Sequence, residues 1–366
     1  MKNNCTFLEK LLDGAEVEWK PLNKIVTTIT APVKLKREMY CSTGSTPIID
    51  QGEKFIAGYT DENFEAIPSN EYIIFGDHSE HIKYVNFSFI QGADGLKILK
   101  PKEDNAKYIY YAFQNFYVKE LNYKRHWSSA KETLIPLPPP TVQTKIVRIL
   151  DALTALTSEL TSELILRQKQ YEYYREKLLS EEELGKVGFE WKTLDQISEN
   201  LDSKRKPITS GLRTSGKIPY YGASGIVDYV EDYIFDGDFL LISEDGANLL
   251  ARNTPIAFSA SGKIWVNNHA HILKFETYEE RRFIEFYLNK IDLTPYISGA
   301  AQPKLNKKNL NSIKFPIPSI PEQQRIVSIL DKFETLTNSI TEGLPLAIEQ
   351  SHKRYEYYRE LLLDFS

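Results

Sequence analysis

The most regular pattern of apolar positions in this chain starts at Ile146 and ends at Leu178. Apolar and aromatic residues recur there at alternating steps of four and three, and only Thr157 and Arg167 interrupt the series. These steps place one stripe of side chains along an α-helix, which is the seam of a coiled coil. The sequence therefore predicts a helix of about 35–40 residues, about 55 Å long.

The same spacing returns from Ile326 to Leu362, with two successive steps of four around Leu344. The second step of four inserts extra residues into the heptad pattern, and Gly343 and Pro345 predict a kink at this point. A second long helix is expected. The residues expected in the seams or in contact with a partner are Ile146, Leu150, Leu153, Leu160, Leu164, Tyr171, Tyr174, Leu178, Ile326, Leu330, Phe333, Ile340, Leu344, Tyr355, Tyr358 and Leu362.

A stretch of mixed pattern precedes each long helix. Short apolar runs bounded by glycine and aspartate favour strands, and longer segments with helical spacing favour one helix per stretch. Each stretch is therefore predicted to be an α/β or α+β domain. The predicted elements are strands at 71–75 and 84–90 and a helix at 108–121, then strands at 239–243 and 270–275 and a helix at 279–291.

The chain is an internal duplication. Residues 171–176 and 355–360 share the sequence Tyr-Glu-Tyr-Tyr-Arg-Glu, and the motifs Ile-Val-x-Ile-Leu-Asp and Glu-Trp-Lys also occur twice. Matches of this length indicate a repeat rather than chance. If the halves are related by a two-fold axis, the helices run antiparallel and hold the two domains at opposite ends. The predicted organisation is a first domain at 1–140, a helix at 141–184, a second domain at 185–318 and a helix at 319–366.

The two copies share little identity between these motifs, and they diverge most in polar, loop-like stretches. A duplicated scaffold with different loops suggests two binding sites of one kind with different preferences. Composition adds little: 42% hydrophobic and 26% charged residues describe an ordinary globular protein. With no long apolar run and only Cys5 and Cys41, a cytoplasmic protein without a membrane span is expected.

The net charge of −5 argues against a nucleic-acid ligand only if charge is spread evenly. The charge is not spread evenly, because acidic residues are concentrated in the helical segments and basic residues cluster elsewhere. No nucleotide-binding, nucleophile-elbow or adenine-methylation motif is present, so neither a catalytic residue nor a cofactor is predicted. The histidine pairs are expected to be surface or loop residues rather than metal ligands: His78 with His81, and His269 with His271.

The duplicated motifs resemble the specificity subunits of type I restriction-modification systems. In that family two variable domains are each followed by a near-identical long helix, as they are along the whole of this chain. The resemblance implies a tandem α/β (α+β) repeat with two target-recognition domains, separated by two helices that form an antiparallel coiled coil. Each domain would read one half of a split DNA sequence.

The resemblance also implies partners. These are double-stranded DNA, two copies of the adenine methyltransferase subunit bound to the helices, and restriction subunits recruited through the complex. It implies no active site in this chain. Two other functions remain open at this point: a coiled-coil scaffold that joins two protein-binding domains without a DNA role, and an enzyme with an unrecognised site.

Candidate DNA contacts follow from the chemistry of the bases. Guanine is read by Arg and Lys, and adenine by Asn and Gln. Such residues in the divergent loops are the candidates, and some are expected to contact phosphates without reading bases. They are Lys34, Lys36, Arg37, Lys124 and Arg125 in the first domain, and Lys204, Arg205, Lys206, Arg213, Asn248 and Lys304 in the second.

Overall fold

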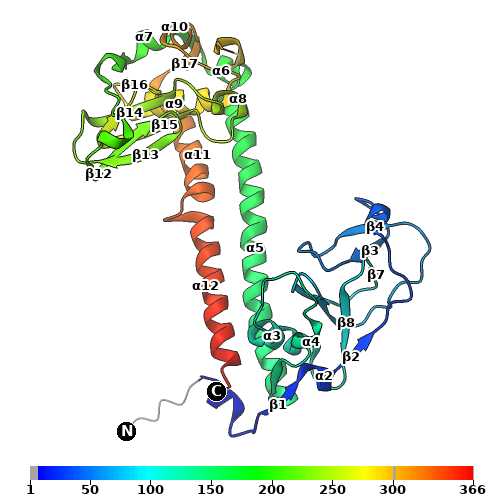
Figure 1. The fold of residues 1–366 in the computed structure, drawn as a ribbon. Helices are drawn as coiled ribbons and strands as arrows, with labels where there is room; N and C mark the ends of the chain where they lie inside the picture. Colours follow the sequence, from blue (N-terminus) through cyan, green and yellow to red (C-terminus); the bar gives the residue numbers. More distant parts are fainter. Residues whose placement is uncertain (1–6, 300–301, 366) are drawn as a thin grey trace, which may run out of the picture. The chain divides into compact units, whose positions relative to one another are not determined.

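The computed structural model describes residues 7–299 and 302–365, which fold into two compact units (Figure 1). One unit comprises residues up to 160 together with those from 347 onward, and the other comprises residues 161–346. Among the described residues, none of the helices is both long and apolar enough to cross a membrane.

Each unit contains one copy of the duplicated α/β domain. The first copy consists of β1 (Glu18–Pro21), α2 (Leu22–Ile25), β2 (Val26–Ile29), η1 (Arg37–Met39), β3 (Thr46–Ile49), β4 (Gly58–Thr60), β5 (Tyr72–Gly76), β6 (Ile82–Val85), β7 (Ile90–Gln91), β8 (Leu96–Pro101), α3 (Ala106–Phe116), α4 (Trp127–Ala130) and β9 (Leu134–Leu137), preceded by α1 (Phe7–Leu12).

The second copy follows helix α6 (Glu181–Val187). It consists of β10 (Phe189–Lys192), α7 (Leu194–Ile197), β11 (Glu199–Asn200), η2 (Asp202–Lys204), η3 (Ser210–Leu212), β12 (Ser215–Gly222), β13 (Gly225–Val230), β14 (Phe235–Ser243), α8 (Asn248–Ala251), β15 (Ala257–Val266), β16 (Ala270–Lys274), α9 (Tyr278–Lys290), η4 (Thr294–Tyr296), α10 (Lys307–Asn311) and β17 (Phe315–Pro318).

The two copies share one order of equivalent strands, although the first copy divides these strands between two sheets. The second copy has one six-stranded sheet in the order β11-β16-β14-β15-β12-β13. The first copy has the order β2-β8-β5-β6, and a separate sheet in the order β4-β3-β7. Strand β15 pairs with β14 along its first part and, in parallel, with β12 at its end. In the first copy β6 pairs with β5, and β7 pairs in parallel with β3. Thus β6 and β7 together correspond to β15.

The prediction of one strand over residues 84–90 is therefore wrong in its middle. Residues 86–89 leave the sheet, because Phe89 pairs with Ile67 in an isolated antiparallel bridge instead of extending the pairing with β5. The predicted helix over 108–121 is also too long, since α3 ends at Phe116.

The central strand of each copy is buried on both faces. Ile73 and Phe75 of β5 face a core shared with α3 and α5, whereas Tyr72 and Ile74 face a second core on the opposite side. Strand β14 alternates between two cores in the same way. Side chains on a strand alternate between its faces, so an uninterrupted apolar run is what a sheet covered on both faces requires.

The repeated motifs at the two ends of each copy pair with each other. Strand β1 pairs antiparallel with β9, which places Trp19 opposite Pro136. Strand β10 pairs with β17 and places Trp191 opposite Pro316. The Glu-Trp-Lys motif and the Pro-x-Pro segments at 136–138 and 316–318 therefore form the two strands of one ribbon, which closes each domain directly before its long helix.

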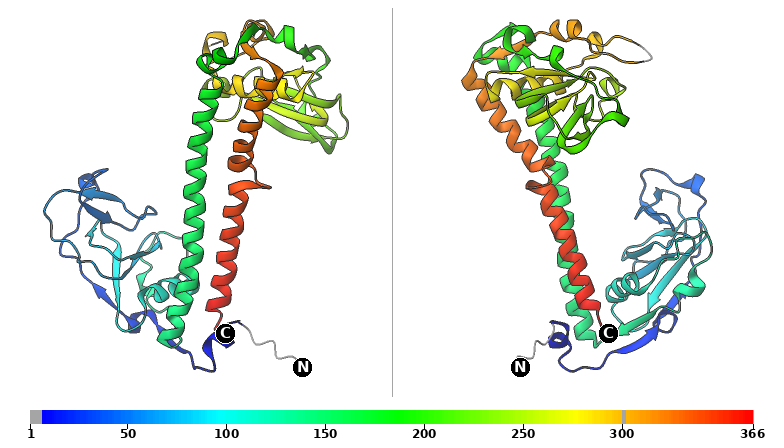
Figure 2. Two further views of the ribbon diagram at one scale, coloured as in Figure 1. Left: turned by 180° about the vertical axis from the view of Figure 1, so that it is seen from behind. Right: turned by 60° about the vertical axis from the view of Figure 1, so that its left-hand side comes forward.

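Helix α5 (Pro140–Leu178) begins in the first unit, where it packs antiparallel to α12 (Gly343–Leu363) (Figure 2). Leu150 shares a core with Leu362, and the Thr157 hydroxyl lies 2.9 Å from that of Ser351. Early residues of one helix thus meet late residues of the other, as in an antiparallel pair.

In the second unit the last part of α5 packs against α11 (Ile320–Asn338). The rings of Tyr174 and Phe333 stack with centroids 5.4 Å apart. Leu178 packs on the core that contains Leu330. The direction is again antiparallel, so the predicted coiled-coil seam is present in each unit.

The second long helix is interrupted rather than kinked. Helix α11 ends at Asn338, α12 begins at Gly343, and the residues between them are not helical. Ile340 lies in this interruption with 79% of its surface exposed, so its prediction as a seam residue is wrong. The extra residues that the heptad pattern indicated leave the helix here instead of shifting its seam.

Candidate nucleic-acid interface

In the first copy, segments that carry predicted DNA contacts meet beside Asp94. Lys34 Nζ lies 2.9 Å from Asp94 Oδ1. The hydrogen bond and charge of Lys34 lower the pKa of Asp94, and the charge of Arg125 lowers it further. Lys36 and Arg37 follow Lys34 with exposed side chains. The fold thus gathers basic residues that are far apart in the sequence.

The loop of residues 117–126 is held in place by a buried carboxylate. Glu80 is 2% exposed and accepts hydrogen bonds from the Tyr117 hydroxyl and from the amides of Glu120 and Leu121, at 2.8–2.9 Å. Burial raises the pKa of Glu80, but these hydrogen bonds outweigh it and lower the pKa on balance. They also draw the chain away from helical geometry, which explains why α3 ends early.

The same loop presents Tyr123 and Lys124 on its outside. Tyr123 is 91% exposed, and its ring stacks on His78 with centroids 5.3 Å apart. The His78 Nδ1 atom lies 3.0 Å from the Lys124 backbone oxygen. Lys124 pairs with Glu120. The loop thus carries an exposed aromatic ring next to exposed basic residues.

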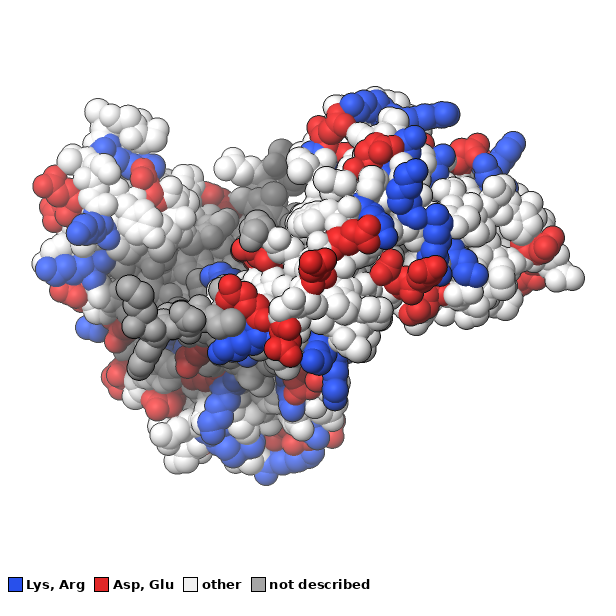
Figure 3. Space-filling view, turned by 90° about the horizontal axis from the view of Figure 1, so that it is seen from below, with Lys and Arg blue, Asp and Glu red and all other residues white. Residues whose placement is uncertain are grey.

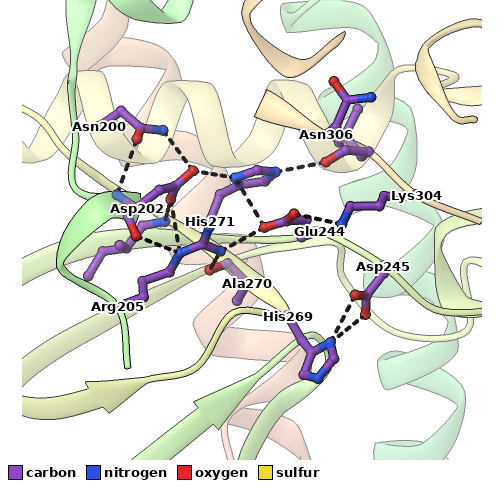
Figure 4. Close-up of polar contacts among 12 residues, drawn as sticks. Asn200, Asp202, Arg205, Glu244, Asp245, His269, Ala270, His271, Lys304 and Asn306 are labelled. Carbon is purple, nitrogen blue, oxygen red and sulfur yellow. Dashed lines mark hydrogen bonds and ion pairs between the residues drawn. The ribbon is translucent and has the colours of Figure 1, made fainter. Parts of the chain in front are cut away.

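In the second copy the corresponding end of the sheet contains a buried ionic network (Figure 4). His271 Nδ1 lies 2.6 Å from Asp202 Oδ2. Arg205 Nη1 lies 2.7 Å from Glu244 Oε2, and Lys304 Nζ lies 3.2 Å from the other oxygen of Glu244. Burial raises the pKa of both carboxyl groups, but the neighbouring His271 and Arg205 outweigh it and lower both pKa values.

Three predicted DNA contacts of the second copy are engaged within the protein. Arg205 donates to Glu244 and to the Ala270 and Asp202 carbonyl oxygens, and its side chain is 12% exposed. We therefore reassign it to the structural network.

Arg213 pairs with Asp228 at 2.9 Å and lies over the Tyr220 ring. The Asn248 amide exchanges two hydrogen bonds with the backbone of Thr254. Arg213 and Asn248 are therefore reassigned from DNA contact to stabilising the local structure in which they lie.

The lysines of this copy remain accessible. Lys204 is 64% exposed beside Glu199 at 3.9 Å, and Lys304 is 49% exposed. Lys206 is also exposed. On the face shown in Figure 3, basic and acidic side chains are interspersed.

The prediction that the histidines lie on the surface or in loops is wrong for His271. It is 1% exposed and lies in strand β16. A polar residue inside the apolar run of residues 270–273 was the signal for a buried ionic partner. His269, two residues earlier, is exposed and pairs with Asp245. Within the described residues no group of histidines, cysteines and carboxylates is arranged to hold a metal ion.

Comparison with known proteins decides the family. Residues 16–167 and 186–350 match the family described as the type I restriction modification DNA specificity domain. The chain is 39% identical to a putative type I restriction enzyme specificity subunit of Haemophilus influenzae, with both chains covered completely. It belongs to the type I specificity subunits.

Two further likenesses agree. The specificity subunit of the Escherichia coli type I restriction enzymes EcoR124I and EcoR124II is 38% identical, covering 99% of this chain and 98% of that one. The crystal structure of a Mycoplasma genitalium S subunit shares the fold, with a TM-score of 0.64 at 19% identity and 97% coverage of this chain. These matches give no support to a scaffold without a DNA role.

Proposed function

We propose that this specificity subunit reads a bipartite DNA target, with one half-site contacted by each copy of the α/β domain. The observation that carries the proposal is one order of equivalent strands built twice, with the basic residues of each copy gathered at the sheet end where β2 and β5, or β11 and β14, finish. Family membership supplies the ligand. The loops differ between the copies, which supports two different half-sites.

In the first copy we assign DNA contact to Lys34, Lys36, Arg37 and Arg125, and to the outer side of residues 117–126. In the second copy we assign it to Lys204, Lys206 and Lys304. Arg205 and Arg213 instead hold local structure in place. This subunit then contributes recognition, while methyl transfer and cleavage belong to partner subunits.

The partners are proposed to be two methyltransferase subunits and, through them, restriction subunits. The duplicated Tyr-Glu-Tyr-Tyr-Arg-Glu segment supports this proposal, because each copy leaves one tyrosine outside the seam. Tyr173 is 59% exposed, and Tyr357, its counterpart, is 62% exposed. Glutamates exposed beside them are Glu172, Glu176, Glu356 and Glu360. Two identical exposed surfaces fit two copies of the same partner.

The function is tested by sequencing the methylated bases of host DNA with and without the gene. We expect modified adenines within one split motif only when the gene is present. In a second strain, residues 161–164 of α5 are deleted. Four helical residues span about 6 Å, against about 3.4 Å per base pair, so the unread gap should shorten by one or two base pairs. A changed half-site in this strain would contradict the proposal that each copy reads independently of the helix.

The partner surface is tested by replacing Tyr173 and Tyr357 with serine together. Both are more than half exposed, so the free energy of unfolding should change by less than about 0.5 kcal/mol. Co-purification of the methyltransferase subunit should be lost. As a control, Tyr233, which is exposed at 40% in the second copy, is changed to serine and should leave co-purification intact. Retention of both methyltransferase subunits by the double variant would refute this surface.

A further inference from the structure

Both ring nitrogens of the buried His271 face groups that can only accept hydrogen bonds. Nδ1 lies 2.6 Å from Asp202 Oδ2, and Nε2 lies 2.7 Å from the Leu305 carbonyl oxygen. A carbonyl oxygen has no proton to give. Asp202 is ionised here, because its other oxygen accepts the Ile272 amide at 3.0 Å and Arg205 lies 3.6 Å away. Both nitrogens are therefore placed to donate, which only an imidazolium ring can do.

The charged groups around the ring are compatible with this state. Asp202 and Glu244 face it, the latter at 3.8 Å. Arg205 and Lys304 approach the same carboxylates from the outside. A neutral ring would present a bare nitrogen to one of its two oxygen partners, and a buried acceptor without a donor is unfavourable.

The two partners of His271 belong to the two segments that carry the exposed lysines of this copy. Asp202 begins η2, which ends at Lys204, and Lys206 follows two residues later. Leu305 directly follows Lys304, and its amide also binds the Glu244 carbonyl oxygen at 2.8 Å. We propose that His271 is a positioning residue, whose charged ring joins these two segments and fixes their lysines in the geometry that meets DNA.

The first copy has a lysine at the equivalent place. Lys97 of β8 is opposite Phe75 of the central strand, as His271 of β16 is opposite Ile242. Lys97 Nζ lies 4.0 Å from Asp77, the residue that follows the central strand. A cation thus occupies this sheet position in both copies. The position is filled by lysine in the first copy and by histidine in the second.

The charge is tested on the full chain labelled with nitrogen-15 in its histidines. Nuclear magnetic resonance at about neutral pH should show two protonated ring nitrogens for His271, assigned by the loss of its signals in His271→Gln. A signal for an unprotonated ring nitrogen would overturn the inference, whatever the chain binds.

The positioning role rests on the proposed function and is tested by selection from a pool of random DNA duplexes, with the chain bound to its methyltransferase partner. His271→Gln should lose about ten- to hundredfold in affinity at one half-site, as expected for a buried acceptor left unpaired. The other half-site should be unchanged. His271→Lys keeps a cation at this position and should retain both half-sites. Tyr233→Ser, at an exposed ring just before the start of β14, is the control.

The outcomes separate the two proposals. A wild-type complex that selects no split motif would refute DNA recognition and the positioning role with it. A wild type that selects two half-sites while His271→Gln selects the same two would refute the positioning role alone. Equal loss of both half-sites in His271→Gln would indicate a general folding role, and that result also overturns the proposal.

Discussion

In each copy the domain is attached to its long helix through an equivalent aspartate, but the side chains that bind this aspartate differ between the copies. Asp151 and Asp331 end the shared Ile-Leu-Asp motif, and each accepts hydrogen bonds from two side chains four residues apart on the helix that packs on the sheet. Asp151 is bound by Lys107 and Tyr111 of α3. Asp331 is bound by Tyr278 and Arg282 of α9.

The cation and the tyrosine have exchanged places between the copies. The contact therefore requires one cation and one hydroxyl one helical turn apart, in either order, because both orders reach the same aspartate. This explains how the copies keep one architecture with little identity between them. The second anchor is also more deeply embedded: Arg282 is 9% exposed and also pairs with Glu285 at 2.6 Å and with Glu334, whereas Lys107 is 33% exposed.

Removing the cation should therefore break the second anchor far more severely than the first. Arg282→Met leaves three carboxylates without their shared cation, and loss of one partner of a buried pair costs about 3–5 kcal/mol. Lys107→Met removes a pair whose side chains are each 33% exposed, and it should cost about 1 kcal/mol or less. The measurement is the opening free energy of α9 and α3 by hydrogen exchange. Equal effects of the two substitutions would show that burial of the anchor does not matter.

The long helices differ as well, since α5 is continuous and its counterpart is interrupted. Gly343, at the start of α12, has φ +81°, and a Cβ there would lie 2.6 Å from the Thr335 backbone oxygen. Gly343→Ala should cost about 1–3 kcal/mol, because the left-handed conformation is strained for alanine. Gly185→Ala is the control, in helix α6 with no atom within 4 Å of the added Cβ.

That control should stabilise the chain by about 0.5–1 kcal/mol, since alanine favours a helix more than glycine does. Chemical denaturation of the full chain measures both variants. A neutral Gly343→Ala would mean that the interruption can rearrange without cost. It would then be a flexible joint rather than a fixed one.

Much of the fold could be predicted from the sequence, because its strongest signals are periodic or duplicated. The heptad spacing gave the helices and their seam, and the identical motifs gave the tandem organisation. Ile340 was misplaced because spacing alone does not show whether inserted residues shift the seam or leave the helix. The break between β6 and β7 depends on Phe89 pairing with Ile67, a long-range choice without a local signal.

The site was less predictable. From the sequence alone, a basic loop residue that faces solvent cannot be distinguished from one that pairs with a carboxylate inside the protein. Arginine is a residue type expected to contact DNA, so Arg205 and Arg213 were natural candidates. Only the structure shows that they form ion pairs with Glu244 and Asp228. Glu80 was missed, and His271 was wrongly predicted to lie on the surface or in a loop, for the converse reason: each is a polar residue whose partners come from distant segments.

The loops that these two residues hold offer the last contrast between the copies. Glu80 carries negative charge in the first copy, whereas the imidazolium of His271 is positive in the second. The pKa of Glu80 is lowered from its ordinary value of 4.5. Its charge therefore stabilises the loop above that pH, and this stabilisation is lost as the pH falls through the lower, folded-state pKa.

Glu80→Gln should reduce the protection of the Glu120 and Leu121 amides by about 1–2 kcal/mol at neutral pH, as for hydrogen bonds to a charged group. The difference from wild type should shrink as the pH falls through the lowered, folded-state pKa of Glu80, because the wild-type carboxyl then takes up its proton. Hydrogen exchange of these two amides is the measurement, and the amide of Leu305 in the second copy is the internal reference. A difference that stays constant across this range would show that the carboxylate shape, and not its charge, holds the loop.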